Sequence, residues 1–191
     1  MEKLRTFIAI ELPDKLKKRL KMLQEELKKN SGNASKISWA RPETIHLTLK
    51  FIGDIDGGKA QEITEGLKKA AENVKAFNIA VQGVGGFPDL KNPRVLWVGI
   101  EEGAELKTLY ENIEERMEAL GFEREKRGFH PHLTLCRIKN PQDGKRLSEG
   151  LKNIKTGGTV NFPAESIVFF KSELGLNGAI HTPLKQIDLK S

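Results

Sequence analysis

The sequence predicts an α+β protein of two similar lobes, whose antiparallel sheets face a central groove and carry helices on their outer faces. Segments of alternating polarity, typical of strands, are interspersed with segments of helical periodicity along all 191 residues. The phrase His-Leu-Thr-Leu occurs at 46–49 and again at 132–135, once in each half of the chain. No long linker separates the halves, so we expect residues 1–191 to form a single domain of two pseudo-symmetric lobes.

The first half alternates between expected strands and expected helices. Residues 4–12 are expected to form a strand that stops at Pro13, a residue that suits the first turn of a helix. Leucines then recur at helical spacing from Leu16 to Leu27. The remaining elements expected here are a strand at 45–53, an amphipathic helix from Ile63 to Val74, and strands at 77–87 and 94–100.

The second half repeats this order of elements. A long apolar stripe runs from Leu106 to Leu120 and is followed by Gly121, which is typical of the residue that ends a helix. We then expect a strand at 130–138, a short helix through Leu147 and Leu151, and strands at 158–162, 166–174 and 179–189.

Composition favours a polyanionic partner and a reducing compartment. The formal net charge is +6, although the lysines are spread over several expected helices, which equally fits solvated surfaces. A single cysteine, Cys136, excludes an intrachain disulfide. The first apolar run is too short for a signal peptide or a membrane span. We therefore expect a cytoplasmic protein, without a membrane partner, that acts as a monomer.

The repeated phrase predicts two matched polar faces. Successive side chains of a strand point to opposite sides, so Leu47 and Leu49 share one face while His46 and Thr48 share the other. In the second copy, Leu133 and Leu135 share one face while His132 and Thr134 share the other. If an approximate two-fold axis relates the lobes, the leucines enter the cores, and two imidazoles and two hydroxyls meet across the groove.

These residue types suit acid and base catalysis on a phosphodiester. Histidine has an ordinary pKa of about 6.5, so it can accept or donate a proton near neutral pH. Two histidines on opposite sides of a phosphorus atom suit in-line attack, with one as the base and the other as the acid. The threonine hydroxyls can hydrogen-bond the non-bridging oxygens.

The two phrases and their flanks resemble one protein family. The two His-Leu-Thr-Leu copies are similar to the paired His-x-Thr-x motifs of the 2H phosphoesterase superfamily. The segments "RTFIAIELP", "RPETIHLTLKFIG", "GVGGFPDLKNPRVLWVGI" and "HPHLTLCRIK" resemble, in order and spacing, the 2′-5′ RNA ligase family, also called RNA 2′,3′-cyclic phosphodiesterase (LigT/ThpR). The match extends to about Lys139 and continues more loosely beyond it.

The resemblance implies an activity and its partners. It implies hydrolysis of 2′,3′-cyclic phosphate RNA ends to 2′-phosphates, together with ATP-independent 2′-5′ joining of RNA ends. The partners implied are such RNA ends, with tRNA fragments as one candidate, and no cofactor or metal is implied. The sequence also lacks a phosphate-binding Gly-x-x-x-x-Gly-Lys-Ser/Thr loop.

The resemblance also implies residue roles. His132 is the expected proton acceptor and His46 the expected proton donor, an assignment that can be reversed, while Thr48 and Thr134 are expected to bind the phosphate. Further candidates for substrate contact, for which exposed structural roles are equally open, are Arg41, Lys50, Arg127, His130 and Arg137. In regular strands Lys50 shares the face of His46, whereas Arg41 and Arg137 share the faces of the leucines.

Histidine and aromatic residues near the motifs leave choices open. His130 and His132 lie two residues apart, but only His132 has a threonine two residues after it, so we expect His132 to be the catalytic one. Phe7, Phe87 and Phe129 are candidates to stack a base, although core packing is the favoured role for each. Trp39 and Trp97 are expected in the core.

Two other classes of function remain open. His130, His132 and Cys136 share strand parity and can be combined into a zinc site, but the spacing fits no common zinc signature. A non-catalytic RNA-binding module needs a positive groove and no paired histidines. Within the enzyme class, another cyclic phosphate or a 2′-5′ nucleotide is an alternative substrate.

Overall fold

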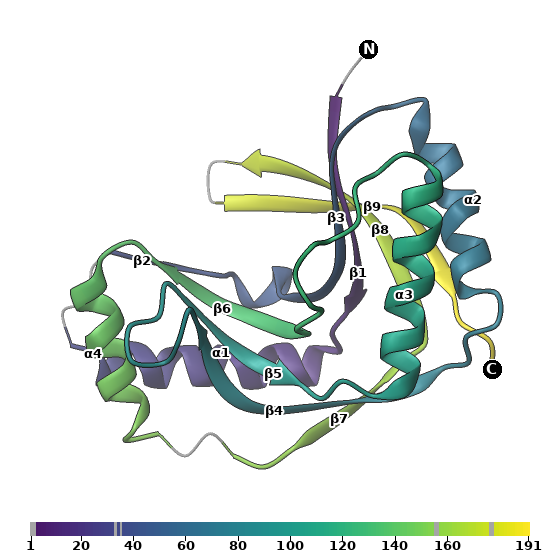
Figure 1. Ribbon diagram of the computed structural model, residues 1–191. Coiled ribbons are helices and arrows are strands. Elements are labelled where there is room, and N and C mark those ends of the chain that lie inside the picture. Colours follow the sequence, from purple (N-terminus) through teal and green to yellow (C-terminus); the bar gives the residue numbers. More distant parts are fainter. Residues whose placement is uncertain (1–2, 33, 35, 155–156, 176–177) are drawn as a thin grey trace.

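The computed structural model describes residues 3–32, 34, 36–154, 157–175 and 178–191, and Figure 1 shows its elements. These are β1 (Lys3–Glu11), α1 (Asp14–Asn30), β2 (Ile37–Trp39), a 3₁₀ turn (Pro42–Thr44), β3 (His46–Asp56), α2 (Lys59–Ala71), β4 (Phe77–Phe87), β5 (Val95–Ile100), α3 (Ala104–Ala119), β6 (His132–Ile138), α4 (Pro141–Leu151), β7 (Val160–Ala164), β8 (Ser166–Gly175) and β9 (Gly178–Asp188). No helix among these described residues is long and apolar enough to cross a membrane.

The strands form two sheets, one in each lobe. The first sheet has the order β3-β1-β8-β9 and the second has the order β2-β6-β5-β4-β7. All pairings within the sheets are antiparallel. The predicted α+β class with two antiparallel sheets is therefore confirmed, and each sheet contains one of the two motif strands, β3 or β6.

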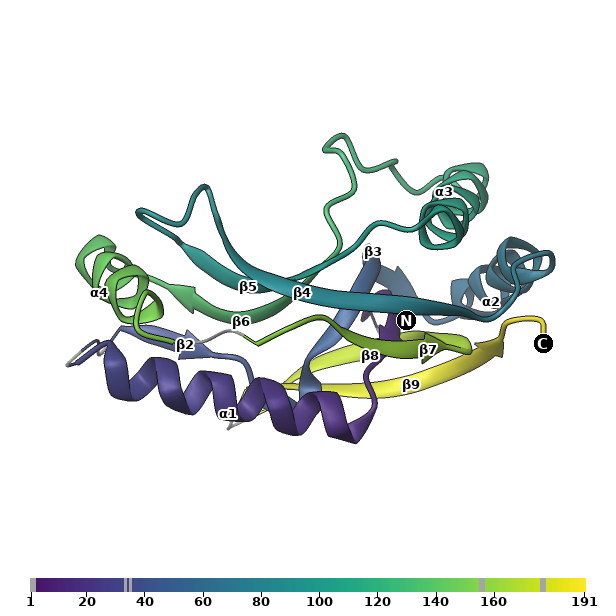
Figure 2. The same ribbon diagram turned by 90° about the horizontal axis from the view of Figure 1, so that it is seen from below.

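Each sheet is covered by a pair of helices. Helices α2 and α3 pack together beside the four-stranded sheet, where α3 contacts β3 and α2 contacts β9 (Figure 1). Helices α1 and α4 contact each other, and α1 runs along the five-stranded sheet (Figure 2). Helix α1 thus follows a strand of the first sheet but covers the second, and α3 follows a strand of the second sheet but covers the first.

The predicted alternation of the motif strands is confirmed. Leu47, Leu133 and Leu135 are fully buried, whereas the histidines and threonines between them are partly exposed. The predicted end of the long helix is confirmed as well, because Gly121 follows α3 with a φ of 87°, a conformation that glycine adopts without strain.

A β-bulge interrupts each motif strand at the same place. In the β1–β3 pairing, Ala9 lies opposite Thr48 and Ile8 opposite Lys50, so Leu49 has no partner residue. In the β5–β6 pairing Leu135 is skipped in the same way. An extra residue shifts the alternation of a strand by one position. Side chains beyond each bulge therefore point to the faces opposite to those expected from a regular strand.

The bulge in β6 is held by a side chain from α1. The amide of Gln24, which is buried, donates to the carbonyl oxygen of Leu135 at 2.9 Å and to that of Ala40 at 2.8 Å. The backbone N–H of Ala40 also donates to the Leu135 carbonyl at 2.9 Å. These bonds satisfy the carbonyl oxygens of Leu135 and Ala40.

Candidate active site

The two motif strands are neighbours although they belong to different sheets. Strand β3 lies at the edge of the first sheet and β6 lies near the edge of the second, and the two strands contact each other. Their polar faces carry His46 with Thr48 and His132 with Thr134, all partly exposed. The fold thus brings together the two halves of the motif, which are remote in the sequence.

The same hydrogen bond orients both imidazoles. His46 Nδ1 lies 2.8 Å from the carbonyl oxygen of Thr44, and His132 Nδ1 lies 2.6 Å from the carbonyl oxygen of His130. A carbonyl oxygen only accepts, so the proton of each neutral ring resides on Nδ1. In both lobes, therefore, Nε2 is the ring nitrogen that is left free to exchange a proton.

Groups on the two polar faces are free to bind a ligand. Among the described residues, neither ring's Nε2 has a hydrogen-bond partner, and neither do the hydroxyls of Thr48 and Thr134. A cavity of about 180 Å³ lies apart from them, between α1 and strands β4, β5 and β7, and its lining contains no histidine. The two polar faces, and not this cavity, carry the motif histidines and are therefore the candidate active site.

Aromatic rings support each histidine. Phe7 is buried and stacks on His46, with ring centroids 4.6 Å apart and planes at 22°. Phe87 meets His132 edge-on at 5.1 Å, and Trp97 lies 6.0 Å from the same ring. Such contacts fix the plane of an imidazole. Phe7 thus has the expected packing role, and its burial removes it as a platform for a base.

One of the two tryptophans has a different place from the one expected. Trp39 packs against the main core, as predicted, but Trp97 does not belong to that core. The ring of Trp97 lies so close to Gly85 that a Cβ there would come within 2.0 Å of it. Only glycine leaves room for a ring beside its backbone. Gly85 thus allows Trp97 to lie next to His132, and the prediction of a core position was wrong because Trp97 faces the polar side of the sheet.

The surroundings keep both histidines neutral in the free protein. Burial lowers the pKa of His46 to about 4, and the charges of His181 and Lys17 act in the same direction, partly offset by the bond to Thr44. Burial also lowers the pKa of His132, with a smaller contribution from the charge of Arg137. A bound anion acts in the opposite direction, since it favours the protonated imidazole.

The low pKa of His46 predicts a pH-dependent stability. In the unfolded chain His46 binds protons near pH 6.5, whereas in the folded chain it binds them only near pH 4, so acid favours the unfolded chain. Lowering the pH from about 7.5 to 5 should therefore cost about 2 kcal/mol of unfolding free energy through this group alone. Urea titrations at both pH values check this: the wild type should lose more stability than His46→Gln, and equal losses would contradict the burial of this imidazole.

The remaining candidate cations have separate places. Arg41 donates through its guanidinium to the carbonyl oxygen of Ala179 at the start of β9. Arg137 is exposed and lies close enough to His132 to lower its pKa, and His130 contributes its backbone carbonyl to that ring. The side chain of Arg127 is exposed, while its backbone N–H donates to Glu125.

The expectation that Arg137 shares the face of the leucines was wrong, because the bulge at Leu135 turns it to the side of His132.

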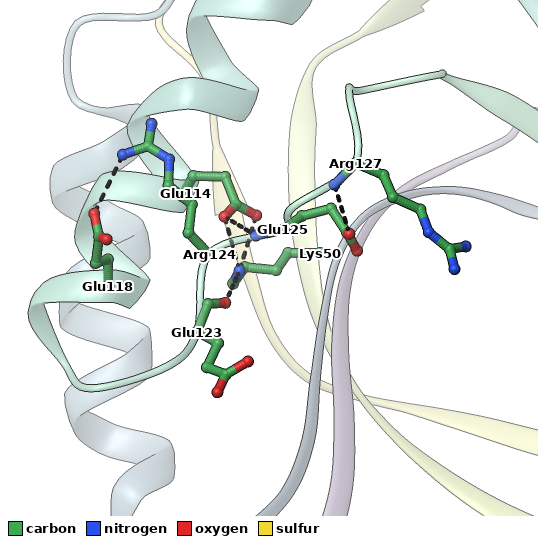
Figure 3. Close-up of polar contacts among 7 residues, drawn as sticks. All are labelled: Lys50, Glu114, Glu118, Glu123, Arg124, Glu125 and Arg127. Atoms are coloured by element: carbon green, nitrogen blue, oxygen red, sulfur yellow. Dashed lines mark hydrogen bonds and ion pairs between the residues drawn. The ribbon is translucent and has the colours of Figure 1, made fainter.

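Lys50 has a different partner from the one expected. It was predicted on the face of His46, but the bulge at Leu49 turns it inward, where it is buried (Figure 3). Its ammonium contacts both carboxylate oxygens of Glu114 in α3, at 2.8 and 2.9 Å, and donates to the carbonyl oxygen of Glu123 at 2.9 Å. Its three donors are thus satisfied within the protein, and Lys50 is not a substrate contact.

Two residues near the motifs, Phe51 and His181, were not predicted from the sequence. Phe51 occupies, beyond the bulge of β3, the position that Arg137 occupies in β6, and it is 68% exposed. A regular strand would have pointed Phe51 into the core, so no periodic signal marks it. His181, from β9, lies next to His46, and nothing in its local sequence distinguishes it.

The alternative zinc site is not supported by this geometry. Cys136 is fully buried in the core, whereas His132 lies on the opposite, polar face of the same strand. Burial raises the pKa of the Cys136 thiol to about 12, which disfavours the thiolate that a metal needs. Within the part of the chain that the structure describes, no three metal-ligating side chains converge.

Comparisons with known proteins agree with this fold. The RNA 2′,3′-cyclic phosphodiesterase of Methanothermobacter thermautotrophicus is 31% identical over 186 residues, covering 96% of this chain and 97% of that protein. The protein of the same name from Thermotoga maritima is 36% identical over 149 residues, or 78% of each chain. Among solved structures, a protein from Thermus thermophilus has a TM-score of 0.77 at 24% identity, covering 98% of each chain.

A further structure and a family match complete the comparison. The E. coli LigT complexed with 3′-AMP has a TM-score of 0.77 at 20% identity and covers both chains entirely, which supports the fold. The family described as LigT like Phosphoesterase matches residues 10–97 and again residues 98–181, so that each repeat contains one of the two motif strands. The chain therefore belongs to the LigT like phosphoesterase family.

Proposed function

We propose that this protein is an RNA 2′,3′-cyclic phosphodiesterase, which hydrolyses cyclic phosphate ends to 2′-phosphomonoesters. The observation that carries the proposal is the pairing of two matched sets of free groups, an imidazole Nε2 and a threonine hydroxyl on each motif strand. Relatives that are 31 to 36% identical have the name RNA 2′,3′-cyclic phosphodiesterase, which supports the same activity here.

The proposed mechanism uses the two histidines in turn. His132 Nε2 takes a proton from water as the water oxygen attacks phosphorus, and the bond from phosphorus to the 3′-oxygen breaks. His46 Nε2 gives its proton to that 3′-oxygen, which leaves a 3′-hydroxyl and a 2′-phosphate. The charge of the bound phosphate favours protonation of His46 before the step.

The same arrangement supports 2′-5′ ligation. A 5′-hydroxyl of a second RNA end replaces water, and His132 takes its proton. The bond to the 3′-oxygen breaks as before, so the product has a 2′-5′ phosphodiester. The strained ring supplies the driving force, and no nucleotide cofactor enters either reaction. Thr48 and Thr134 donate hydrogen bonds to the non-bridging oxygens in both reactions.

Two residues beyond the bulges complete the proposed site. The charge of Arg137 acts on His132, and a guanidinium suits the charge of a phosphate. Phe51, at the equivalent position of the first lobe, offers an exposed ring on which the terminal base can stack. The proposed substrates are RNA ends, including tRNA fragments, that present a 2′,3′-cyclic phosphate to a monomeric protein.

Loss of the cation at Arg137 should slow the reaction more than loss of a remote cation. We expect Arg137→Ala to lower kcat/KM about 10²-fold, because a charge-assisted hydrogen bond to the phosphate disappears. Arg137→Lys keeps the charge but not the planar fork, and should recover part of the loss. Arg127→Ala is the matched control and should change the rate by less than about threefold. Equal losses at both positions would remove Arg137 from the site.

Turnover separates this function from its alternatives. The purified protein is incubated with a short RNA that ends in a 2′,3′-cyclic phosphate, and the product is identified as a 2′- or a 3′-phosphate by chromatography against both standards. We expect the 2′-phosphate, at a rate that EDTA leaves unchanged. Binding without turnover would support an RNA-binding module instead, and preferential hydrolysis of another cyclic or 2′-5′ nucleotide would redirect the substrate.

A further inference from the structure

A third histidine lies beside the proposed proton donor. The ring of His181, in β9, meets the ring of His46 with centroids 5.3 Å apart and planes at 84°. It also meets the edge of Phe7 at 4.9 Å. Phe7 in turn stacks between His46 and Phe170, so the four rings form one cluster on the polar side of the first sheet. This cluster fixes His181 next to the place where the reaction is proposed to occur.

The two ring nitrogens of His181 differ in their surroundings. Nδ1 is buried, and it has no hydrogen-bond partner among the described residues. Nε2 is not enclosed in this way, and no bond to it is formed within the described part of the chain. A buried N–H without an acceptor is costly, so the proton of the neutral ring belongs on Nε2. His181 therefore presents one free N–H donor at its accessible edge.

Two permanent cations, Lys17 and Arg41, act on this region. Burial and the charge of Arg41 lower the pKa of His181. The charges that lower the pKa of His46 are those of His181 and Lys17, and Glu11 is the residue opposite His46 in the β1–β3 pairing. The guanidinium of Arg41 is held by the carbonyl oxygen of Ala179, two residues before His181. The side of the site around His46 thus has a guanidinium whose charge reaches the His181 ring.

One cyclic phosphate does not need Arg41 and His181 in addition to the motif residues. It carries a single negative charge and lies between the two motif histidines in the proposed reaction, where Arg137 already faces it from the other lobe. In an RNA strand the next phosphate is one nucleotide away on the 5′ side. A donor and a guanidinium beside His46 suit an anionic oxygen that belongs to the substrate but not to its reacting ring.

We propose that His181 and Arg41 form a second phosphate subsite, which binds the phosphodiester that joins the terminal nucleotide to the rest of the RNA. His181 contributes its Nε2–H and Arg41 contributes its charge. The proposal rests on the proposed function, since it takes the cyclic phosphate as the group held by the two motif histidines. It makes the site selective for RNA ends over free nucleoside cyclic phosphates.

The test compares two substrates that differ only in the second phosphate. One is adenosine 2′,3′-cyclic phosphate, and the other is the same compound with a methyl phosphodiester on its 5′-oxygen. The wild type should prefer the second substrate in kcat/KM, mainly through KM. In His181→Phe, which keeps the ring contacts, this preference should fall about tenfold, as it should in Arg41→Met. His181→Gln keeps a donor and should retain most of the preference.

Controls distinguish the subsite from a structural role. Lys185→Ala removes an exposed cation from the same strand and should keep the full preference. If His181→Phe slows both substrates equally, His181 acts only through His46 and the second subsite is wrong. If the wild type hydrolyses neither substrate, the proposed function fails instead. Calorimetric binding of adenosine and of its methyl 5′-phosphodiester still tests the subsite in that case: the phosphodiester should bind more tightly, and His181→Phe should abolish the difference.

Discussion

Replacing either His46 or His132 with alanine is expected to lower the turnover of a 2′,3′-cyclic phosphate RNA by roughly 10²- to 10⁴-fold. Each variant removes the imidazole that is proposed to move a proton on its side of the phosphorus, because in both lobes a carbonyl bond leaves Nε2 free for that exchange. The double variant should lose far less than the product of the two single losses, since acid and base serve one transition state. Single-turnover rates on one RNA measure all three variants.

His130→Ala is the matched control for this prediction. The contact that orients His132 comes from the backbone carbonyl of His130, which the alanine variant keeps. We therefore expect a loss of about tenfold or less, equivalent to about 1.4 kcal/mol of transition-state stabilisation. A larger loss at His130 than at His132 would mean that the catalytic register is displaced by two residues. Circular dichroism spectra of all variants should match the wild type, because these side chains are partly exposed.

Breaking the buried pair of Lys50 and Glu114 is expected to have the largest effect on stability. Lys50→Met leaves a buried carboxylate whose partner is lost, and such an uncompensated charge costs about 3 to 5 kcal/mol. The same carboxylate also accepts the backbone N–H of Glu125 at 3.0 Å, so the segment that leads to β6 is held at this point (Figure 3). Urea unfolding monitored by circular dichroism measures the loss.

A double variant distinguishes the effect of the unpaired charge from the effect of lost side-chain packing. In Lys50→Met with Glu114→Leu both charges are absent, so the double variant should be more stable than Lys50→Met alone. The exposed pair of Lys68 and Glu65 provides the control, and Lys68→Ala should leave the unfolding curve unchanged. A double variant as unstable as the single one would show that packing, and not the unpaired charge, causes the loss.

The sequence predicted the elements and the faces of the motif strands, because both depend on local periodicity. Leu47 and Leu133 alternate with polar residues, and buried leucines fix which face of a strand turns inward. The three-residue strand β2 was missed because it is too short to show alternation. His181 was missed because its role depends on β9 pairing with β8 in the sheet that contains His46.

The two bulges explain the other differences between the predicted and the observed side-chain directions. Neither Leu49 nor Leu135 is a glycine or has one beside it, so the local sequence gives no sign of an interruption. The backbone at the bulge in β6 is bonded by Gln24, from a helix more than a hundred positions earlier, and that contact is visible only in three dimensions. The incorrect side-chain directions of Lys50, Cys136 and Arg137 all lie just beyond one of these two positions.

The exchange of helices between the sheets means that the lobes cannot be cut apart. Helix α1 leaves a strand of one sheet to cover the other, and α3 does the reverse. A cut in the loop between β5 and α3 would therefore yield two pieces, each with strands of both sheets and neither with a complete lobe. We expect such fragments to be unfolded when alone and to regain structure when mixed, and we expect the intact chain to unfold in one transition by calorimetry. Two separate transitions would show that the lobes are independent folding units.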